Sequence, residues 1–389
     1  MAIGLRNAVI RNPLVRQLGI YFRHIQAAAE GIPVEIQAEM RAAFRQNRLI
    51  ITDYAYHPYR LPLEASASGH LLIARFEREA ANYAATLQRW SLHIDALARI
   101  PRDASAPLGP LWNNIWFPPF DGVSLYGLIA ENRPARYLEV GSGISTRFAR
   151  QAITDLGLKT QIVSIDPHPH NPIEGLCDEI IVSRLEEMPT SFWEELSKDD
   201  MLFIDNSHRS FPASDVTVFF AEIMPAIPAG VVFGLHDIFL PHDYPEEFMH
   251  RFYNEQYLLM TYLLGGGGAD EIILPVYWAS CQPKLSDILK PLWRRDELFH
   301  GLSTGGGCFW LRRGQSNRRS ICYSSKCSIR SAPYSPFSCV GRRGARSRAS
   351  GRSASQGGPQ IDPCGLSGTG NHQSRCGCES PRGSAAWAS

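Results

Sequence analysis

The stretch Ala135-Arg-Tyr-Leu-Glu-Val-Gly-Ser-Gly-Ile-Ser-Thr-Arg-Phe-Ala149 predicts the centre of the fold. Its apolar run ends at Val140 and stops at a glycine, which is typical of a buried strand in a parallel sheet. The two glycines predict a tight turn, and Ser145 or Thr146 can supply the N-cap oxygen of a helix that follows. A strand, a glycine turn and a helix N-terminus together form a cradle for a nucleotide-like cofactor.

Three residues around this turn distinguish between cofactors. A dinucleotide-binding turn has a third glycine at the position of Thr146, so a pyrophosphate is disfavoured. Glu139, at the end of the strand, would repel a pyrophosphate but suits the positively charged end of S-adenosylmethionine (SAM). Asp166 ends the next apolar run, at a spacing suited to binding ribose hydroxyls. A lone Gly-x-Gly is often only a tight turn, but the combination predicts a SAM site.

The composition is that of a soluble globular protein with one large α/β domain and an appendage, or with two domains. The net charge over 389 residues is +1, so no basic excess indicates binding to nucleic acid. The sequence shows neither a transmembrane run nor a secretory signal, and we expect no membrane partner. Before residue 314 the cysteines are only Cys177, Cys281 and Cys308, a scarcity that fits a reducing cytoplasm.

Residues 1–110 are predicted to be mostly helical. Apolar residues recur at helical spacing from Glu35 to Phe44 and from Leu71 to Ile100. Aromatic residues at such spacing usually belong to a core, so we interpret this region as a helical cap or as the contact between copies in a homo-oligomer. A lid over the substrate is the alternative.

Residues 111–313 alternate between strand and helix patterns, which predicts a Rossmann-like α/β domain with a mostly parallel sheet covered on both faces. Asp121 is expected to cap the helix that precedes the first strand. The connection before the last strand favours an antiparallel strand at the sheet edge. The seven predicted strands are Tyr137–Val140, Gln161–Asp166, Asp178–Ser183, Met201–Asp205, Val231–Leu235, Glu271–Tyr277 and Cys308–Arg312.

Residues 314–389 differ in composition from everything before them. They are rich in Ser, Arg, Gly, Pro and Cys, and Asp362 and Glu379 are their only acids. Without apolar periodicity, this low-complexity tail is predicted to be disordered. The abrupt change resembles translation in a shifted reading frame or a fusion scar, and an arginine-rich segment that binds RNA is the alternative.

Two polar clusters follow the predicted fourth and fifth strands, Asp205-Asn-Ser-His208 and His236-Asp237. The carboxyl ends of the strands form the ligand-binding edge of an open α/β sheet, so we expect these residues to meet there. His236 could accept the proton of a hydroxyl that attacks a methyl group, with His208 as the second candidate. Asp205, His236 and Asp237 could also bind one divalent cation, Mg²⁺ or Mn²⁺. The alternative is a set of loop residues that only cap turns.

Four motifs occur in order along the chain: Glu139-Val-Gly-Ser-Gly, Ser164-Ile-Asp-Pro, Phe203-Ile-Asp-Asn-Ser-His and His236-Asp-Ile-Phe-Leu-Pro-x-Asp-Tyr-Pro. Together they resemble a class I SAM-dependent methyltransferase, in the branch that includes macrolide-sugar O-methyltransferases. The resemblance spans about residues 112–313 and implies a seven-stranded sheet with an antiparallel last strand. Some relatives bind Mg²⁺ through one acid after the fourth strand and two acids after the fifth, and His236 replaces one of those acids here.

The predicted function is methyl transfer from SAM to a hydroxyl of a small molecule or a saccharide, with His236 as the general base. A SAM-binding or assembly module without catalysis is one alternative. A nicotinamide-dependent oxidoreductase is another, which the acid and the missing glycine at the turn disfavour. The predicted cofactor-binding residues are Glu139, Gly141, Ser142, Gly143, Asp166 and Asp205.

Overall fold

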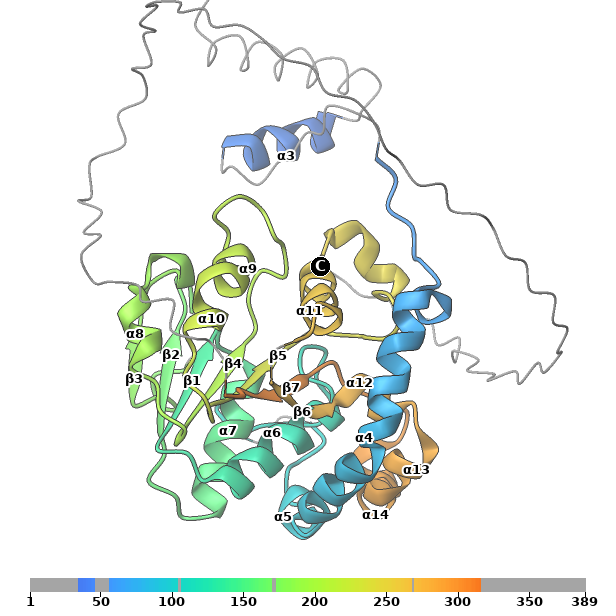
Figure 1. Cartoon of the computed structure of the whole chain (residues 1–389). Coiled ribbons are helices and arrows are strands. Elements are labelled where there is room, and N and C mark those ends of the chain that lie inside the picture. The colour runs from blue at the N-terminus through green and yellow to red at the C-terminus, as the bar shows by residue number, and fades with distance from the viewer. Residues whose placement is uncertain (1–33, 46–55, 104–105, 170–172, 268, 316–389) are drawn as a thin grey trace, which may run out of the picture. The chain divides into compact units, whose positions relative to one another are not determined.

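The computed structural model describes residues 34–45, 56–103, 106–169, 173–267 and 269–315 (Figure 1). The chain divides into two compact units, Met1–Ile321 and Cys322–Ser389, and the second lies entirely outside these ranges. The disorder expected for residues 314–389, and the interpretation of that tail, therefore stay predictions.

A seven-stranded sheet forms the centre of the first unit, in the order β3-β2-β1-β4-β5-β7-β6. Its strands are β1 (Arg136–Val140), β2 (Gln161–Ile165), β3 (Glu179–Ile181), β4 (Asp200–Ile204), β5 (Val232–Leu235), β6 (Glu271–Pro275) and β7 (Phe309–Arg312). β7 runs antiparallel to both β5 and β6, while the other pairs are parallel. This confirms the predicted Rossmann-like sheet with an antiparallel last strand. The expected edge position was wrong, because β7 inserts between β5 and β6 and leaves β6 at the edge.

The order in which successive strands are added to the sheet reverses direction at β1, in the centre of the sheet. From β1 the chain proceeds through β2 to β3 at one edge, and then crosses back to place β4 on the other side of β1. All of β4 and all but the first residue of β1 are buried, as expected for central strands with both faces covered. Ligands of open α/β sheets bind in the crevice at the carboxyl ends of the strands where such a reversal occurs.

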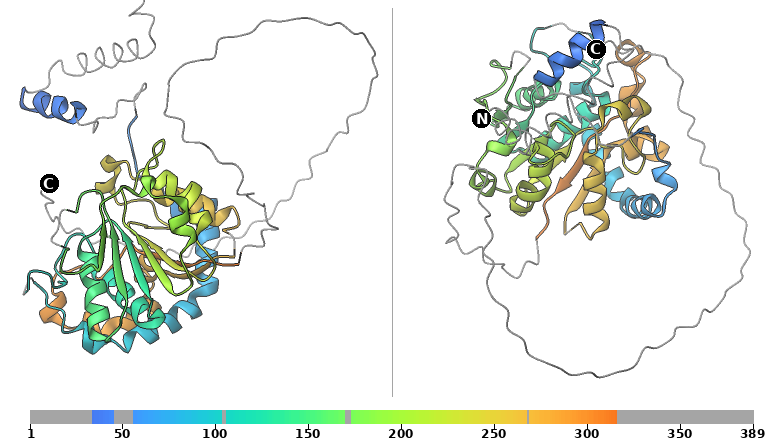
Figure 2. Two further views of the ribbon diagram at one scale, coloured as in Figure 1. Left: turned by 90° about the vertical axis from the view of Figure 1, so that its left-hand side faces the viewer. Right: turned by 90° about the horizontal axis from the view of Figure 1, so that it is seen from above.

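Helices cover both faces of the sheet. Figure 1 and Figure 2 show α6 and α7 side by side on one face, with the α9–α10 segment and α11 on the other. The helices and 3₁₀ or π turns are α3 (Val34–Arg45), η1 (Leu63–Ala65), α4 (Ala67–Ser91), α5 (Ile94–Leu97), α6 (Pro119–Asn132), α7 (Ile144–Asp155), η2 (Leu185–Glu187), α8 (Thr190–Glu194), α9 (Asp215–Val218), η3 (Phe219–Ile223), α10 (Met224–Ala226), η4 (Glu246–Arg251), α11 (Glu255–Leu264), α12 (Val276–Ser280), α13 (Pro283–Ser286), η5 (Asp287–Leu289), α14 (Lys290–Trp293) and α15 (Asp296–Phe299).

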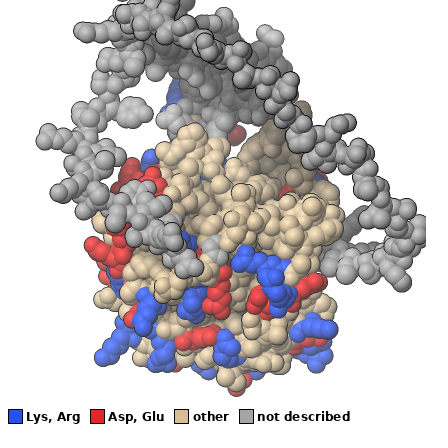
Figure 3. All heavy atoms as spheres, in the orientation of Figure 1, with Lys and Arg blue, Asp and Glu red and all other residues tan. Residues whose placement is uncertain are grey.

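The surface of the described residues carries charges of both signs. On the face shown in Figure 3, Lys and Arg side chains are interspersed with Asp and Glu side chains over the lower part of the molecule. Within the described ranges, no helix combines the length and the apolar character that a bilayer crossing requires.

Two predicted helices are interrupted in the structure. The sequence also predicts one helix from Phe248 to Leu264. The structure has η4 and α11 there instead, because Phe252 between them has a left-handed backbone with φ of 55°. The helix expected from Leu71 to Ile100 ends at Ser91 and is followed by the short α5. The helix predicted from Glu35 to Phe44 is present as α3.

α4 packs its apolar side against the sheet domain. Ser66 caps the helix, since its Oγ accepts a hydrogen bond from the Gly69 amide at 3.0 Å. Phe76 lies against Trp278 of α12 with a centroid separation of 5.5 Å, and Trp90 is buried where α4 crosses α6. The interpretation of residues 1–110 as a cap or an oligomer contact stays a prediction, but α4 itself contributes to the core of the first unit.

Asp121 does not cap α6, which corrects the sequence-based expectation. The helix begins at Pro119, so Asp121 lies within its first turn and is fully buried. Its carboxylate accepts hydrogen bonds from the amides of Gly307 and Cys308, both at 2.7 Å. The first-turn amides are satisfied without it, because Phe120 donates to the carbonyl of Gly305 and Asp121 to that of Pro118. Asp121 thus joins α6 to the segment that leads into β7.

We expect Gly127→Ala to destabilise the protein, because a β-carbon at this position in α6 would lie 2.3 Å from the Trp90 ring. In an ordinary helix the same change stabilises by about 0.5–1 kcal/mol. Here we expect a loss of about 1–3 kcal/mol in the free energy of unfolding, measured by urea denaturation. In a Trp90→Leu background the cost should shrink or change sign. An equal cost in both backgrounds would show that α4 does not pack on α6 as described.

Candidate active site

The glycine turn at the end of β1 depends on Gly141. This residue has φ of 78°, and a β-carbon on it would lie 2.1 Å from the carbonyl oxygen of Asp205. Only glycine therefore allows the ends of β1 and β4 to approach so closely. The helix that follows begins at Ile144 with Gly143 as its N-cap, so the expected caps Ser145 and Thr146 lie inside the first turn. Thr146 accepts the Gly143 amide through Oγ1 at 3.0 Å.

Glu139 lies beneath this turn and is fully buried. Its carboxylate accepts a hydrogen bond from the Tyr137 hydroxyl at 2.9 Å and another from the Thr146 hydroxyl. Burial raises the pKa of Glu139 to about 7, although hydrogen bonds from Ser145, Thr146 and Tyr137 act in the opposite direction. Glu139 thus holds the turn from below, and its contact with a cofactor stays a prediction.

Asp166 is joined to the other side of the turn. Its Oδ2 accepts hydrogen bonds from the amide of Ser142 at 3.1 Å and from the hydroxyl of Ser142 at 2.8 Å. Its Oδ1 accepts the amide of His168 at 2.8 Å. The structure therefore brings together the predicted residues of the turn and of the β2 end. The contact of Asp166 with a ribose stays a prediction.

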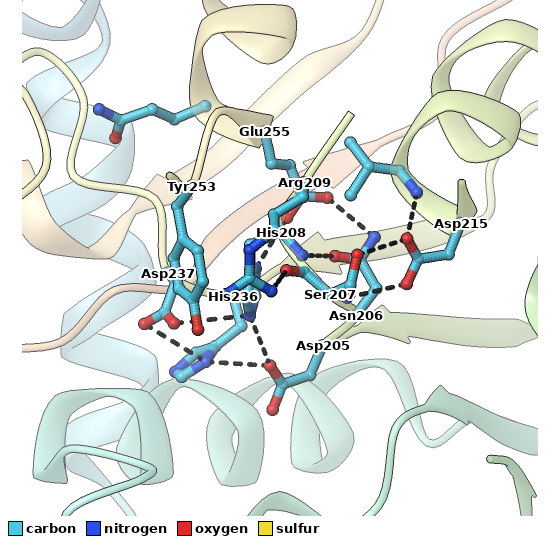
Figure 4. Close-up of polar contacts among 12 residues, drawn as sticks. Asp205, Asn206, Ser207, His208, Arg209, Asp215, His236, Asp237, Tyr253 and Glu255 are labelled. Carbon is cyan, nitrogen blue, oxygen red and sulfur yellow. Dashed lines mark hydrogen bonds and ion pairs between the residues drawn. The ribbon is translucent and has the colours of Figure 1, made fainter. Parts of the chain in front are cut away.

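The predicted residues after β4 and β5 meet at the same edge of the sheet (Figure 4). The Asp205 carboxylate lies 3.3 Å from Nε2 of His208 and 3.4 Å from Nδ1 of His236. Asp237 lies 3.5 Å from Nε2 of His208 and 3.7 Å from Nδ1 of His236. The histidines are only 4% and 3% exposed, whereas the Asp205 side chain is 34% exposed. The imidazoles are therefore enclosed, and Asp205 is the most accessible of the four.

Glu255 pairs with His208 on its other nitrogen. Its Oε2 lies 2.9 Å from Nδ1 of the imidazole, and its Oε1 accepts a hydrogen bond from the Asn206 amide group at 3.2 Å. Glu255 is fully buried at the first position of α11. Nothing in the sequence singles out Glu255, because an acid at a helix start is also expected for interaction with the helix dipole.

Asp121 is the corresponding partner of His236. Its Oδ2 lies 3.4 Å from Nε2 of the imidazole, at a distance and alignment that form no regular hydrogen bond. The ring packs against Phe117 and Phe203, with centroid separations of 5.3 Å and 6.0 Å. No motif signals this pairing, since 115 positions separate the two residues along the chain, from 121 to 236.

The carboxylates shift the pKa values of both histidines upward. Burial alone would lower the pKa of His208, but hydrogen bonds to Asp205 and Glu255 and the charge of Asp237 raise it well above its ordinary value. Burial would also lower the pKa of His236, but the negative charges of Asp205 and Asp237 raise it well above its ordinary value. Burial would raise the pKa of Asp205, but the charge of His236 and hydrogen bonds from both histidines hold it below its usual range.

Backbone strain is present in the same cluster. His208 has φ of 58° and Asp237 has φ of 53°, in the left-handed region that side chains with a β-carbon rarely adopt. Such residues cost about 1–3 kcal/mol each and persist where surrounding contacts fix them, often at functional sites. Both loops are therefore held in a defined conformation.

The predicted metal ligands Asp205, His236 and Asp237 are adjacent but do not form a cation site in this arrangement. Nε2 of His208 lies between the two carboxylates at hydrogen-bond distance. Within the described ranges, the ligand atoms of a different group, Asp121, His236 and Cys308, lie within 4.8 Å of one another. Asp121 in that group already accepts two backbone amides. The residues present do not fit the metal that the resemblance implies.

Residues 138–238 match a family model described as a methyltransferase domain. The matched region runs from β1 to the residue after Asp237, and so contains the glycine turn and both polar clusters. Together with the strand order, this match confirms the resemblance to class I methyltransferases. No curated protein matches the chain.

Three solved structures show the range of similar proteins. PaMTH1, a methyltransferase of Podospora anserina bound to S-adenosylhomocysteine (SAH), is 14% identical, with 67% of this chain and 100% of that chain covered and a TM-score of 0.32. MycE, from the mycinamycin pathway and bound to Mg, SAH and mycinamycin VI, is 16% identical over 49% of this chain and 48% of that chain, with a TM-score of 0.24. A branched-chain polyamine synthase of Thermus thermophilus is 13% identical over 59% and 65%, with a TM-score of 0.30. With TM-scores below 0.5, these likenesses carry no argument about activity.

We expect Glu139→Gln to weaken the dependence of stability on pH. The pKa of Glu139 is raised in the folded state, so its contribution to stability is complete below its ordinary pKa of 4.5 and is lost as the pH rises through about 7. Between pH 6 and pH 8.5 the wild type should lose on the order of 1–3 kcal/mol that the variant retains, measured by urea denaturation at both pH values. The control is Glu187→Gln, which alters an exposed acid in η2. Equal losses in wild type and Glu139→Gln would refute the pKa shift.

Proposed function

We propose that the protein transfers a methyl group from SAM to a hydroxyl of a small molecule or a saccharide. The observation that carries the proposal is the position of three features at one edge of the sheet. The glycine turn, the Asp166 carboxylate and the cluster around Asp205 all follow strands that end side by side at the reversal of the sheet. A methyltransferase domain matches this same region.

The residues present fit SAM as a ligand. A carboxylate at the end of β2 can accept hydrogen bonds from ribose hydroxyls, and Asp166 stands at that position with both oxygens already bound to donors. The acids Asp205 and Asp237 add negative charge near the crevice, which suits a sulfonium rather than a pyrophosphate. When bound, SAM would supply an activated methyl group.

The side chains of the cluster would position the acceptor and remove its proton. Most of the acceleration would come from alignment of the hydroxyl with the donor, since the methyl group is already activated. We assign the general base to His236, with His208 in reserve, because Nδ1 of His236 faces the accessible carboxylate of Asp205. A neutral imidazole is needed to accept the proton, and the raised pKa of His236 means that alkaline conditions favour that form.

The acceptor class rests on the four motifs and their resemblance to O-methyltransferases. A hydroxyl needs a base at the moment of transfer, and an enclosed imidazole beside carboxylates provides one. A SAM-binding module without catalysis would share the glycine turn but show no turnover. An oxidoreductase would bind NADH instead, which fluorescence of the bound nicotinamide would report.

We expect Asp166→Ala to weaken SAH binding about 10–100-fold, because two ribose hydroxyls would lose their shared acceptor. The measurement is isothermal titration calorimetry with SAH. Asp199→Asn, an exposed acid in the turn before β4 at the opposite edge of the sheet, is the matched control and should bind as the wild type does. Wild-type protein that binds no SAH would end the proposal, and an unaltered Asp166→Ala affinity would remove Asp166 from the site.

We expect His236→Gln to retain SAH affinity within about threefold and to lose methyl transfer at least 100-fold, because general-base catalysis contributes about 10²–10⁴-fold. A panel of hydroxylated small molecules and saccharides is first tested with the wild type, with SAH release as the readout. The variant is then assayed with the accepted compound. Turnover that survives in His236→Gln but disappears in His208→Gln would move the base to His208.

A further inference from the structure

Two arginines lie next to the polar cluster and share one aromatic ring. Arg209 directly follows His208 in the loop after β4, and Arg251 is the last residue of η4. Cζ of Arg209 lies 5.0 Å from the ring centroid of Tyr253, and Cζ of Arg251 lies 5.8 Å from it. The same ring lies 4.7 Å from the imidazole centroid of His208 (Figure 4). Tyr253 therefore connects both guanidinium groups to the candidate active site.

These two positive charges are not neutralised by the described part of the chain. Both arginines are partly buried, yet neither forms an ion pair with a carboxylate of the described residues. Asp215, which lies only six positions after Arg209, binds the amide and the hydroxyl of Ser207 instead, at 2.8 Å and 2.6 Å. Two like charges beside one ring repel each other, and partly buried charges are usually paired. The pair is therefore suited to a negative charge from outside the chain.

Arg209 is fixed in place by the backbone. Its Nε donates to the carbonyl of Arg251 at 2.7 Å, and its Nη1 donates to the carbonyl of Ser207 at 3.0 Å. Carbonyl oxygens hold the guanidinium group without cancelling its charge, and Nη2 keeps its hydrogens for another acceptor. Arg209 thus provides a preoriented positive group.

Arg251 keeps the donors that recognise an oxyanion. Its only hydrogen bond to the described residues is from Nη1 to the Tyr253 hydroxyl, at 3.5 Å, so Nε and Nη2 are left over. Elsewhere in this protein the same two atoms of Arg136 bind both carboxylate oxygens of Asp200, at 3.0 Å and 2.7 Å. A guanidinium group binds a carboxylate or a phosphate through two parallel hydrogen bonds in this way.

The position of the arginines favours the acceptor over the cofactor as their ligand. Asp166, the predicted ribose ligand, follows β2, whereas Arg209 follows β4, and β1 lies between these two strands. Cζ of Arg251 also lies 4.6 Å from the ring centroid of Phe248. Aromatic rings therefore adjoin the two charges, which suits an acceptor with a flat or apolar part next to its charged group.

We propose that Arg209 and Arg251 bind an anionic group, a carboxylate or a phosphate, on the hydroxylated acceptor. The acceptor class then narrows from any small molecule or saccharide with a hydroxyl to those that also carry a negative charge. The role of the bound molecule as acceptor rests on the proposed function, whereas the binding of an anion at these arginines does not.

The test is a binding titration followed by ligand-observed NMR, with no SAM present. The probes are 4-hydroxybenzoate, 4-hydroxyphenyl phosphate and the neutral 4-hydroxybenzamide, so the two anions distinguish a carboxylate site from a phosphate site. We expect wild-type protein to bind at least one anion about tenfold or more tighter than the amide, because hydrogen bonds to charged groups are the stronger ones. High salt should weaken the anion and leave the amide unchanged.

Arg251→Gln should reduce the preference for the anion to within about twofold, and Arg251→Lys, which keeps the charge, should retain part of it. Arg209→Gln should act in the same direction. The matched control is Arg78→Gln, an exposed arginine of α4, which should bind all probes as the wild type does. Circular dichroism shows whether each variant is folded. If Arg209→Gln is not, Arg251→Gln decides, since it gives up only one long hydrogen bond.

Equal affinity for anion and amide in the wild type, or no anion binding at about 10 mM, would overturn the inference. A preference that survives in folded Arg251→Gln would also overturn it. Displacement of the bound anion by SAH would assign the arginines to the carboxylate of the cofactor and refute their role toward the acceptor. Protein that binds the anions through these arginines but neither binds SAH nor transfers methyl groups would contradict the proposed function alone.

Discussion

The close approach of Gly141 to the carbonyl of Asp205 sets the geometry of the whole edge. It brings the end of β1 against the end of β4, at the point where the sheet reverses the direction of its growth. The Gly141 amide donates to Ile165, and the Asp205 amide donates to Val140, so three neighbouring strand ends are tied together by backbone hydrogen bonds. Asp166, Asp205 and His208 leave the sheet within a few residues of these bonds, whereas Asp121 and Glu255 reach the cluster from helices. A β-carbon on this one glycine would separate the proposed cofactor turn from the polar cluster.

Charge balance is the second constraint on this edge. Four acids, Asp121, Asp205, Asp237 and Glu255, surround two imidazoles in a region largely removed from water. Charges enclosed in this way are stable only when they are paired, because removal of one partner leaves an uncompensated charge. The two histidines are therefore part of the electrostatic framework as well as candidates for chemistry. This explains why two strained backbone positions occur here, since the pairing fixes loops that would otherwise relax.

The sequence was sufficient to predict the sheet and those site residues that directly follow strand ends. Strand periodicity located all seven strands, and the positions of Asp166, Asp205 and His236 just after strand ends placed them at one edge. Asp121 and Glu255 could not be assigned in this way. Each lies at the start of a helix, where an acid has an ordinary local explanation, and each reaches the site only through tertiary packing. The insertion of β7 between β5 and β6 was missed for the same reason, because strand patterns do not specify neighbours.

The interior position of β7 has a consequence for how the domain is assembled. Among the described strands β6 pairs with β7 alone, and 33 residues, 276–308, separate the end of β6 at Pro275 from the start of β7 at Phe309. During synthesis, therefore, β6 leaves the ribosome without a partner and cannot join the sheet until residue 312 has followed it. The same late segment carries the amides that bind Asp121 behind His236. Completion of the sheet and closure of the polar cluster are thus one event, which occurs after nearly all of the domain has been translated.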